Sequence, residues 1–198
     1  MKGLVAAAAV LLLLSGCAGA PAARREANRT PAAGATGAAG ASAGGRYNEA
    51  DVMFLQMMVT HHGQGLEMVR LAERKATRDE VRTLAAAIDV TQTDEVATMT
   101  GWLRSWGRPT EADSNAHAHA HHGGMPATGP AEIEALRQAD GADFERKFLN
   151  LLVAHQHNAA ELAGAELRGG TNFATKELAG RIEASRNAQI KQMLAMLG

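Results

Sequence analysis

Apolar residues recur with the period of an α-helix along most of the chain that follows residue 46. In the stretch that begins at Asp51, one broad helical face is apolar and also carries His61, while Asp51 and His62 lie along the edge of that face. The methionines on this face are Met57, Met58 and Met68. The charged residues fall on the opposite face, so the imidazoles are predicted to point inward with the thioethers.

An inward imidazole is costly unless each ring nitrogen finds a partner. Imidazole and thioether together form a donor set that suits copper. The alternative is that the methionines are ordinary core residues, because their flexible side chains fill irregular gaps.

The same periodicity predicts four long helices and one short helix. Their expected limits are 48–76, 77–106, 130–139 (the short one), 141–169 and 171–198. The residues Asn48 and Asp51 resemble a capping box, and Thr77 with Glu80 forms a second one. Aromatic residues make up only 4% of the chain and strand-like runs are missing, so we expect an all-α protein.

The two long hairpins repeat each other. Adding 94 to a residue number in the first half gives a matching residue in the second, as in the pairs Phe54–Phe148, His61–His155, Ile88–Ile182 and Leu103–Leu197. Two duplicated hairpins, 47–107 and 140–198, are expected to pack as a four-helix bundle with a pseudo-two-fold axis. Helices 1 and 3 of that bundle would bring His61 and His155 to the same level.

Polar residues interrupt the apolar stripes of the second and fourth long helices. They are Gln92 and Glu95 in one stripe, and Arg186 and Gln189 in the other. A charge in an apolar stripe must be paired or must bind something. Glu95 and Arg186 could form an ion pair, or Gln92 and Glu95 could orient the histidines or ligate a metal directly.

The N-terminal region is predicted to be a targeting segment. Residues 1–16 combine Lys2 with an apolar run too short for an ordinary membrane-spanning helix. The run ends in Leu-Ser-Gly-Cys at Cys17, which resembles a bacterial lipobox whose cysteine is acylated. Residues 17–46 are rich in Ala, Gly and Pro and are expected to be a flexible tether. We therefore expect an extracytoplasmic protein that is lipid-anchored to the bacterial cell membrane.

The connection 110–129 between the hairpins is rich in histidine. Its possible donors are His117, His119, His121, His122 and Met125. A linker of this composition could capture copper, zinc or nickel with low specificity, or could be a polar linker with chance histidines. The charges nearly balance, with 20 Lys and Arg against 21 Asp and Glu, so nucleic acid is not an expected partner.

These motifs together resemble the domain-of-unknown-function 305 family. The family pattern reads here as Asp51 and Phe54, then Met58 with His61–His62, and then Gln92 and Glu95 on the next helix. The resemblance covers about residues 47–198. It implies a ferritin-like four-helix bundle in a secreted or lipid-anchored protein, and it implies copper binding, which some members show.

The second half departs from that pattern, because His155-Gln156-His157 replaces the histidine pair and His157 is expected to face solvent. We therefore expect one asymmetric site, built mainly by the first half and completed by His155. Its candidate metal ligands are Asp51, Met57, Met58, His61, His62, Met68, Glu95 and His155. The residues expected to support these ligands are Gln92, Arg186 and Gln189.

Three functions follow from the sequence. The first is copper sequestration or delivery, with a metal-transfer protein as the expected recipient and another transition metal as the alternative cargo. The second is a ferritin-like redox enzyme with a dinuclear metal centre, although such centres need inward Glu-x-x-His pairs that this chain lacks. The third is a metal-free structural or partner-binding lipoprotein, in which Glu95 pairs with Arg186.

Overall fold

Five α-helices make up the part of the chain that the structure, a computed structural model, describes, namely residues 43–111 and 128–198. The helices are α1 (Glu49–Lys75), α2 (Asp79–Ser105), α3 (Pro130–Gln138), α4 (Gly141–Gly169) and α5 (Phe173–Leu197). The predicted signal peptide, Cys17, nearly all of the tether and the linker donors lie outside the described residues; these donors are His117, His119, His121, His122 and Met125.

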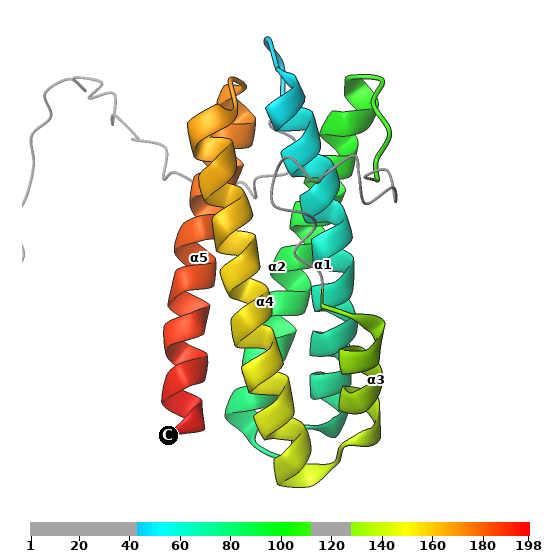
Figure 1. The fold of residues 1–198 in the computed structure, drawn as a ribbon, viewed down its shortest axis with the longest axis vertical. Helices are drawn as coiled ribbons and strands as arrows, with labels where there is room; N and C mark the ends of the chain where they lie inside the picture. The colour runs from blue at the N-terminus through cyan, green and yellow to red at the C-terminus, as the bar shows by residue number, and fades with distance from the viewer. Residues whose placement is uncertain (1–42, 112–127) are drawn as a thin grey trace, which may run out of the picture. The chain divides into compact units, whose positions relative to one another are not determined.

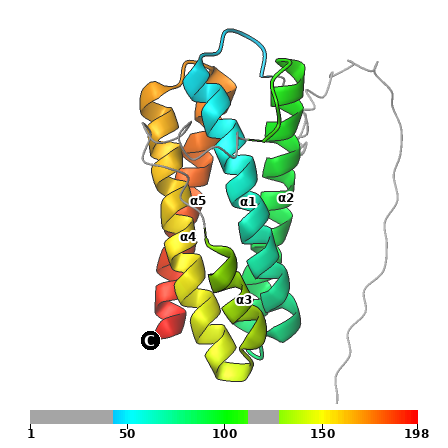
Figure 2. The same ribbon diagram turned by 45° about the vertical axis from the view of Figure 1, so that its right-hand side comes forward.

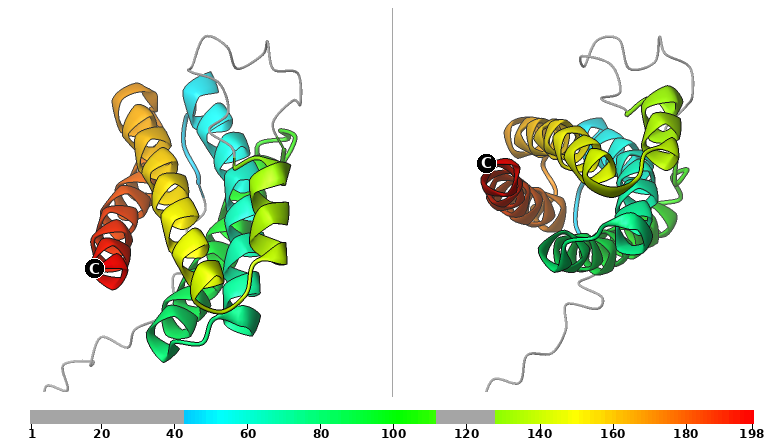
Figure 3. Two further views of the ribbon diagram at one scale, coloured as in Figure 1. Left: turned by 60° about the horizontal axis from the view of Figure 1, so that its bottom comes forward. Right: turned by 90° about the horizontal axis from the view of Figure 1, so that it is seen from below.

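The four long helices form a bundle of two hairpins. Helix α1 packs against α2 within the first hairpin, α4 packs against α5 within the second, and α1 and α4 form the contact between them. The short α3 lies outside the bundle against α4 and α1 (Figures 1 and 2). The view along the helices shows the same arrangement (Figure 3). The prediction of an all-α bundle is confirmed, and none of the described helices is both long and apolar enough to span a membrane.

The apolar interior is divided into two clusters along the bundle. One cluster contains Met68, Ile88 and Phe148, and the other contains Phe54, Met99 and Ile182. Every long helix contributes to both clusters, and each helix carries one or two buried polar residues between its two contributions. The polar residues therefore form a layer across the middle of the bundle.

The two hairpins cap each other's turns through buried carboxylates. Asp51 on α1 accepts hydrogen bonds from the backbone N–H groups of Thr171 (3.2 Å) and Asn172 (3.0 Å) in the α4–α5 turn. Glu145 on α4 accepts from the backbone N–H groups of Thr77 (2.6 Å) and Arg78 (2.7 Å) in the α1–α2 turn. The partners in the two contacts differ by 94 in residue number, so the contacts are the structural counterpart of the sequence repeat.

These contacts correct two expectations. Asp51 is occupied by the α4–α5 turn and by the backbone of Asn48, three turns of helix away from His62, so it does not join the histidines as a ligand. The predicted capping box at Thr77 is wrong, because Arg78 is the N-cap of α2 and the Thr77 hydroxyl donates to Glu145 instead. The predicted box of Asn48 and Asp51 is confirmed.

A second buried acid lies beside Asp51. Burial and the neighbouring Asp51 raise the pKa of Glu166 to about 9. Burial alone would also raise the pKa of Asp51, but the hydrogen bonds from the backbone of Asn48 and from the α4–α5 turn lower it. Asp51 is therefore ionised and Glu166 protonated at neutral pH, because two adjacent buried carboxyls share one charge more easily than they carry two.

The variant Asp51→Asn tests whether Asp51 is structural. An amide cannot replace the charged acceptor of several backbone N–H groups, so we expect the free energy of unfolding of the metal-free protein to fall by about 2 kcal/mol. Urea denaturation measures this change. The control is Glu49→Gln in the same first turn, where an exposed ion pair with Arg108 contributes less than about 1 kcal/mol. Unchanged stability combined with lost copper binding would make Asp51 a ligand after all.

The variant Glu166→Gln should change how stability depends on pH. The stability that comes from the raised pKa of Glu166 is fully present below the ordinary pKa of 4.5 and is lost as the pH rises through about 9. Glu166→Gln should therefore match the wild type near pH 4 and be more stable than it at pH 8. Thermal denaturation across this range, with the exposed Glu161→Gln as control, measures the difference. Parallel pH curves for all three proteins would contradict the assignment.

Candidate metal site

The polar layer at the middle of the bundle contains two residues from each long helix. They are His61 and His62 from α1, Gln92 and Glu95 from α2, His155 and Gln156 from α4, and Arg186 and Gln189 from α5. On each helix the layer lies between residues of the two apolar clusters. The helical stripe that forms the core therefore also places these side chains inside.

The rings of His61 and His155 stack on each other where α1 meets α4. Their centroids are 3.7 Å apart and their planes differ by 17°. Burial lowers the pKa of His61 well below its ordinary value, with contributions from His155, His62 and Arg186. Burial also lowers the pKa of His155 to about 3. Both rings are therefore neutral at physiological pH, and a neutral imidazole is the form that ligates metals.

Several ring nitrogens in this layer make no hydrogen bond to any described residue. They are both nitrogens of His61, Nδ1 of His62 and Nε2 of His155. The side-chain nitrogen and oxygen of Gln92 likewise make no hydrogen bond to any described residue. A buried polar atom without a partner costs on the order of 1–3 kcal/mol, so this concentration of such atoms calls for an explanation.

His62 takes part in a charged network with α2 and α5. Its Nε2 lies 2.7 Å from Oε2 of Glu95 and 3.2 Å from Nη2 of Arg186, which also pairs with Glu95. Burial would raise the pKa of Glu95, but the hydrogen bond from His62 and the charge of Arg186 lower it. Because Glu95 is ionised and only accepts, the proton of the neutral His62 lies on Nε2. The lone pair of Nδ1 is then available to a metal, as in metal sites where a carboxylate orients a ligating histidine.

The second half keeps the shape of this network without its charge. Gln156 corresponds to His62 and Gln189 to Glu95, and the Gln156 amide donates to Oε1 of Gln189 at 2.7 Å. The same pair of helical positions is thus bonded in both hairpins. Only the first hairpin offers an imidazole and a carboxylate there, and one asymmetric metal site stays a prediction.

A glycine makes room for the side chains that meet at His155. A Cβ at Gly65 would lie 2.5 Å from Oε1 of Gln92 and 2.9 Å from Nε2 of His155. On its other edge His155 is held by Thr128, whose hydroxyl lies 2.9 Å from Nδ1. Thr128 in turn donates its backbone N–H to Gln64 at 3.2 Å. Thr128 therefore fixes the orientation of the His155 ring.

The predicted methionine ligands fall in different places. Met58 belongs to one apolar cluster and Met68 to the other, so both serve as core residues. Met57 is buried, lies one turn before His61 and belongs to neither cluster. It is the methionine that the structure leaves as a candidate thioether ligand.

The histidines share a layer but do not converge on one point. Among residues 43–111 and 128–198, no three side chains of His, Cys, Asp or Glu are arranged to hold a metal ion. The lone pairs of the stacked rings of His61 and His155 point along nearly parallel planes. Metal binding therefore requires one of these rings to rotate within the layer.

Three residues of the site do not follow from helical periodicity alone. Gln156 could have been found by applying the repeat to His62, which predicts a side chain in the same layer. The importance of Gly65 could also have been predicted, because a glycine on an otherwise apolar helical face indicates a close approach of another group. Thr128 had no such signal, since nothing in the sequence around it indicates a contact with His155.

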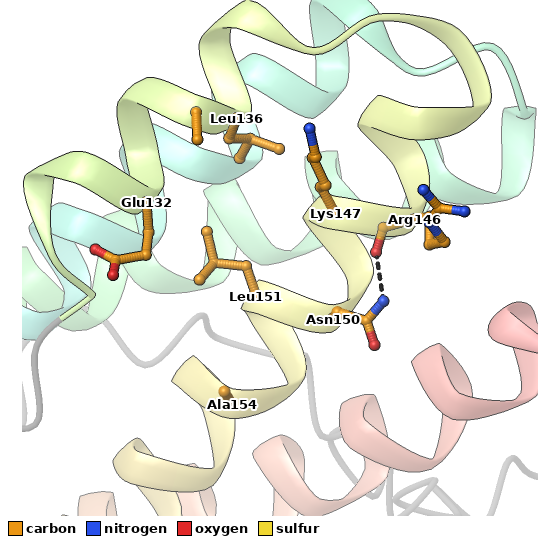
Figure 4. Close-up of a pocket in the computed structure, with 8 residues that line it drawn as sticks. Glu132, Leu136, Arg146, Lys147, Asn150, Leu151 and Ala154 are labelled. Carbon is orange, nitrogen blue, oxygen red and sulfur yellow. Dashed lines mark hydrogen bonds between the residues drawn. The ribbon is translucent and has the colours of Figure 1, made fainter.

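A separate surface pocket of about 440 Å³ lies between α3 and α4 (Figure 4). Leu136, Leu151 and Ala154 supply apolar lining, and Glu132 and Lys147 lie at the same pocket. None of the predicted metal ligands lines it.

Comparison with known families gives one match and several structural neighbours. The profile of the family described as "Domain of unknown function (DUF305)" matches residues 51–197. A candidate secreted DUF305 protein from Streptomyces coelicolor is 30% identical with a TM-score of 0.70, covering 75% of this chain and 91% of its own. A DUF305 fragment from Deinococcus radiodurans is 25% identical with a TM-score of 0.68, covering 78% and 99%. No curated protein matches the chain.

The protein CopM is a further structural neighbour. Its Cu(I)-bound form is 28% identical to this chain with a TM-score of 0.63, and the match covers 74% of this chain and 94% of CopM. CopM has also been solved with Cu(II) and with Ag.

The variant Gly65→Ala tests the close approach at His155. The added methyl group must displace Gln92 or His155, and we expect the free energy of unfolding to fall by about 1–3 kcal/mol. The matched control is Gly63→Ala on the same helix, where a Cβ meets nothing within 4 Å. That variant should gain up to about 1 kcal/mol from helix propensity. Equal effects of the two substitutions in chemical denaturation would show that the space at Gly65 is not needed.

Proposed function

We propose that this chain, which belongs to the DUF305 family, is an extracytoplasmic copper-binding protein. Its proposed role is to sequester or deliver copper. The observation that carries this proposal is the group of buried, neutral imidazoles with unpartnered nitrogens in the polar layer. Most of the buried side-chain atoms without a partner among the described residues lie in this layer, and the ring nitrogens of His61, His62 and His155 make up four of them. The copper-bound forms of CopM support the choice of metal.

The residues that would hold copper are His61, His62 and His155. His62 would ligate through Nδ1, because Glu95 holds the proton on Nε2, and His155 would ligate through Nε2, because Thr128 occupies Nδ1. Met57 is the candidate for a thioether ligand. Imidazole serves both oxidation states of copper, and a thioether favours Cu(I).

Binding rather than redox catalysis fits the composition of the polar layer. A dinuclear ferritin-like centre needs several inward carboxylates. In the layer defined above the only carboxylate is Glu95, and it is already paired with Arg186. Two further buried acids, Asp51 and Glu145, cap the turns of the opposite hairpins. We therefore propose that the protein stores or passes on the ion without turning over a substrate.

The proposed place of action is the outer face of the bacterial cell membrane. A lipid on Cys17 would anchor the protein, and the tether would hold the bundle away from the bilayer. The histidine-rich linker would add a weaker capture site, and a metal-transfer protein is the proposed recipient of the copper.

Titration of the full chain with Cu(I) against a competing chelator tests the proposal. The double variant His61→Gln/His155→Gln should lose the tight site, with an affinity lower by on the order of 100-fold or more, because it removes two ligands. The control is His157→Gln, because His157 lies two residues after His155 on α4 with its side chain exposed beside Glu161. This variant should bind Cu(I) with unchanged affinity.

A variant in which the four linker histidines are replaced separates the two modes of capture. It should keep the tight site and lose only weaker, additional binding. If the core variant and the linker variant lose the same binding, or if the wild type binds no more tightly than a histidine-rich peptide, copper binding in the bundle is excluded.

A further inference from the structure

The polar layer contains a fixed positive charge at a position where the repeat predicts none. Arg186 corresponds to Gln92 in the first hairpin, and it is fully buried. Its guanidinium lies 3.2 Å from Nε2 of His62, across one imidazole ring from the nitrogen that would ligate copper. A permanent cation beside a cation-binding site is an unusual arrangement, because it opposes binding.

The charge of Arg186 is balanced by Glu95. The two side chains are paired, and Glu95 is the only carboxylate among the eight residues of the layer. The two charges cancel, and an imidazole ligates a metal in its neutral form, so the layer offers no net charge to a bound ion. An ion that enters the layer therefore brings a charge that no side chain of the layer offsets.

The cost of burying such a charge depends steeply on its size. The desolvation penalty of an ion rises with the square of its charge, while the repulsion by Arg186 rises in proportion to it. A neutral layer can therefore take a monovalent ion far more easily than a divalent one. Without Arg186, the carboxylate of Glu95 would offset one unit of charge and would reduce this difference.

We propose that Arg186 is a specificity-determining residue that makes the site selective for Cu(I) over divalent ions such as Zn(II), by neutralising Glu95. This inference rests on the proposed function, since it concerns the same site. It assigns Arg186 an effect on the ratio of two affinities, which a merely structural role in the bundle would not alter.

The test compares Ag(I) with Zn(II). Ag(I) stands in for Cu(I) because it is monovalent and is not oxidised by air. Both ions are titrated into the full chain in which the four linker histidines are replaced by Asn and Met125 by Leu, so that the linker donors do not contribute. The variant Arg186→Gln copies the residue at the equivalent position of the first hairpin. It should raise the affinity for Zn(II) relative to Ag(I) by about tenfold or more, because Glu95 then carries an unbalanced negative charge.

Two further variants separate charge from shape. Arg186→Lys keeps the charge but changes the geometry, and its Zn(II)-to-Ag(I) ratio should stay near that of the parent. Glu95→Gln keeps an acceptor for the Nε2 proton of His62 but leaves Arg186 unbalanced, so the ratio should move the other way, toward Ag(I). The shift expected in Glu95→Gln is independent of Arg186→Gln, so the proposal remains testable even if Arg186→Gln does not fold. Circular dichroism checks the folding of each variant.

The outcomes distinguish this inference from the proposed function. Saturable Ag(I) binding with ratios that shift in opposite directions in Arg186→Gln and Glu95→Gln would support the selectivity role. Saturable Ag(I) binding with the same ratio in all variants, or equal shifts in Arg186→Lys and Arg186→Gln, would overturn the selectivity role and leave copper binding intact. No saturable binding of either ion by the parent would overturn both.

Discussion

The structure depends on how polar groups are accommodated inside an apolar bundle. Backbone and side-chain polar atoms that leave water must find partners, and the chain provides these at three levels. At the two ends of the bundle, Asp51 and Glu145 accept the N–H groups of the turns. At the middle, Glu95 pairs with Nη2 of Arg186, whereas His61, Gln92 and Nε of Arg186 do not find partners in the described part of the chain. Apart from the two carboxyl oxygens of Glu166, the buried side-chain atoms without a partner among the described residues lie in the middle of the bundle, where a ligand could satisfy them.

The duplication explains why the polar layer is regular in shape but asymmetric in chemistry. The repeat places a bonded pair at the same level in each hairpin, His62 with Glu95 in one and Gln156 with Gln189 in the other. The glutamine pair preserves packing and hydrogen bonding but supplies no imidazole and no charge. One hairpin thus provides most of the chemistry, and the other provides a scaffold of matching shape together with His155.

Much of this architecture was predictable from the sequence, and the limits of prediction have physical causes. Helical periodicity located the long helices, and the constant offset of 94 placed His61 opposite His155. The role of Asp51 was not predictable, because a buried carboxylate at an inward position can either ligate a metal or accept backbone N–H groups. Only the course of the α4–α5 turn decides between these roles. The contact of Thr128 with His155 was not predictable for a similar reason, since no local sequence pattern marks a loop residue that contacts a distant ring.

The exchanged carboxylates have a consequence for the history of the fold. A single hairpin on its own would expose an uncapped turn at one end and an acid with no backbone to accept from. Two identical hairpins related by a two-fold axis would supply each other with both, in the manner of an isologous homodimer. The present chain keeps that mutual dependence within one polypeptide. Its ancestor can accordingly be pictured as a self-associating half-length protein whose two copies were later joined by the connection that now carries the histidines.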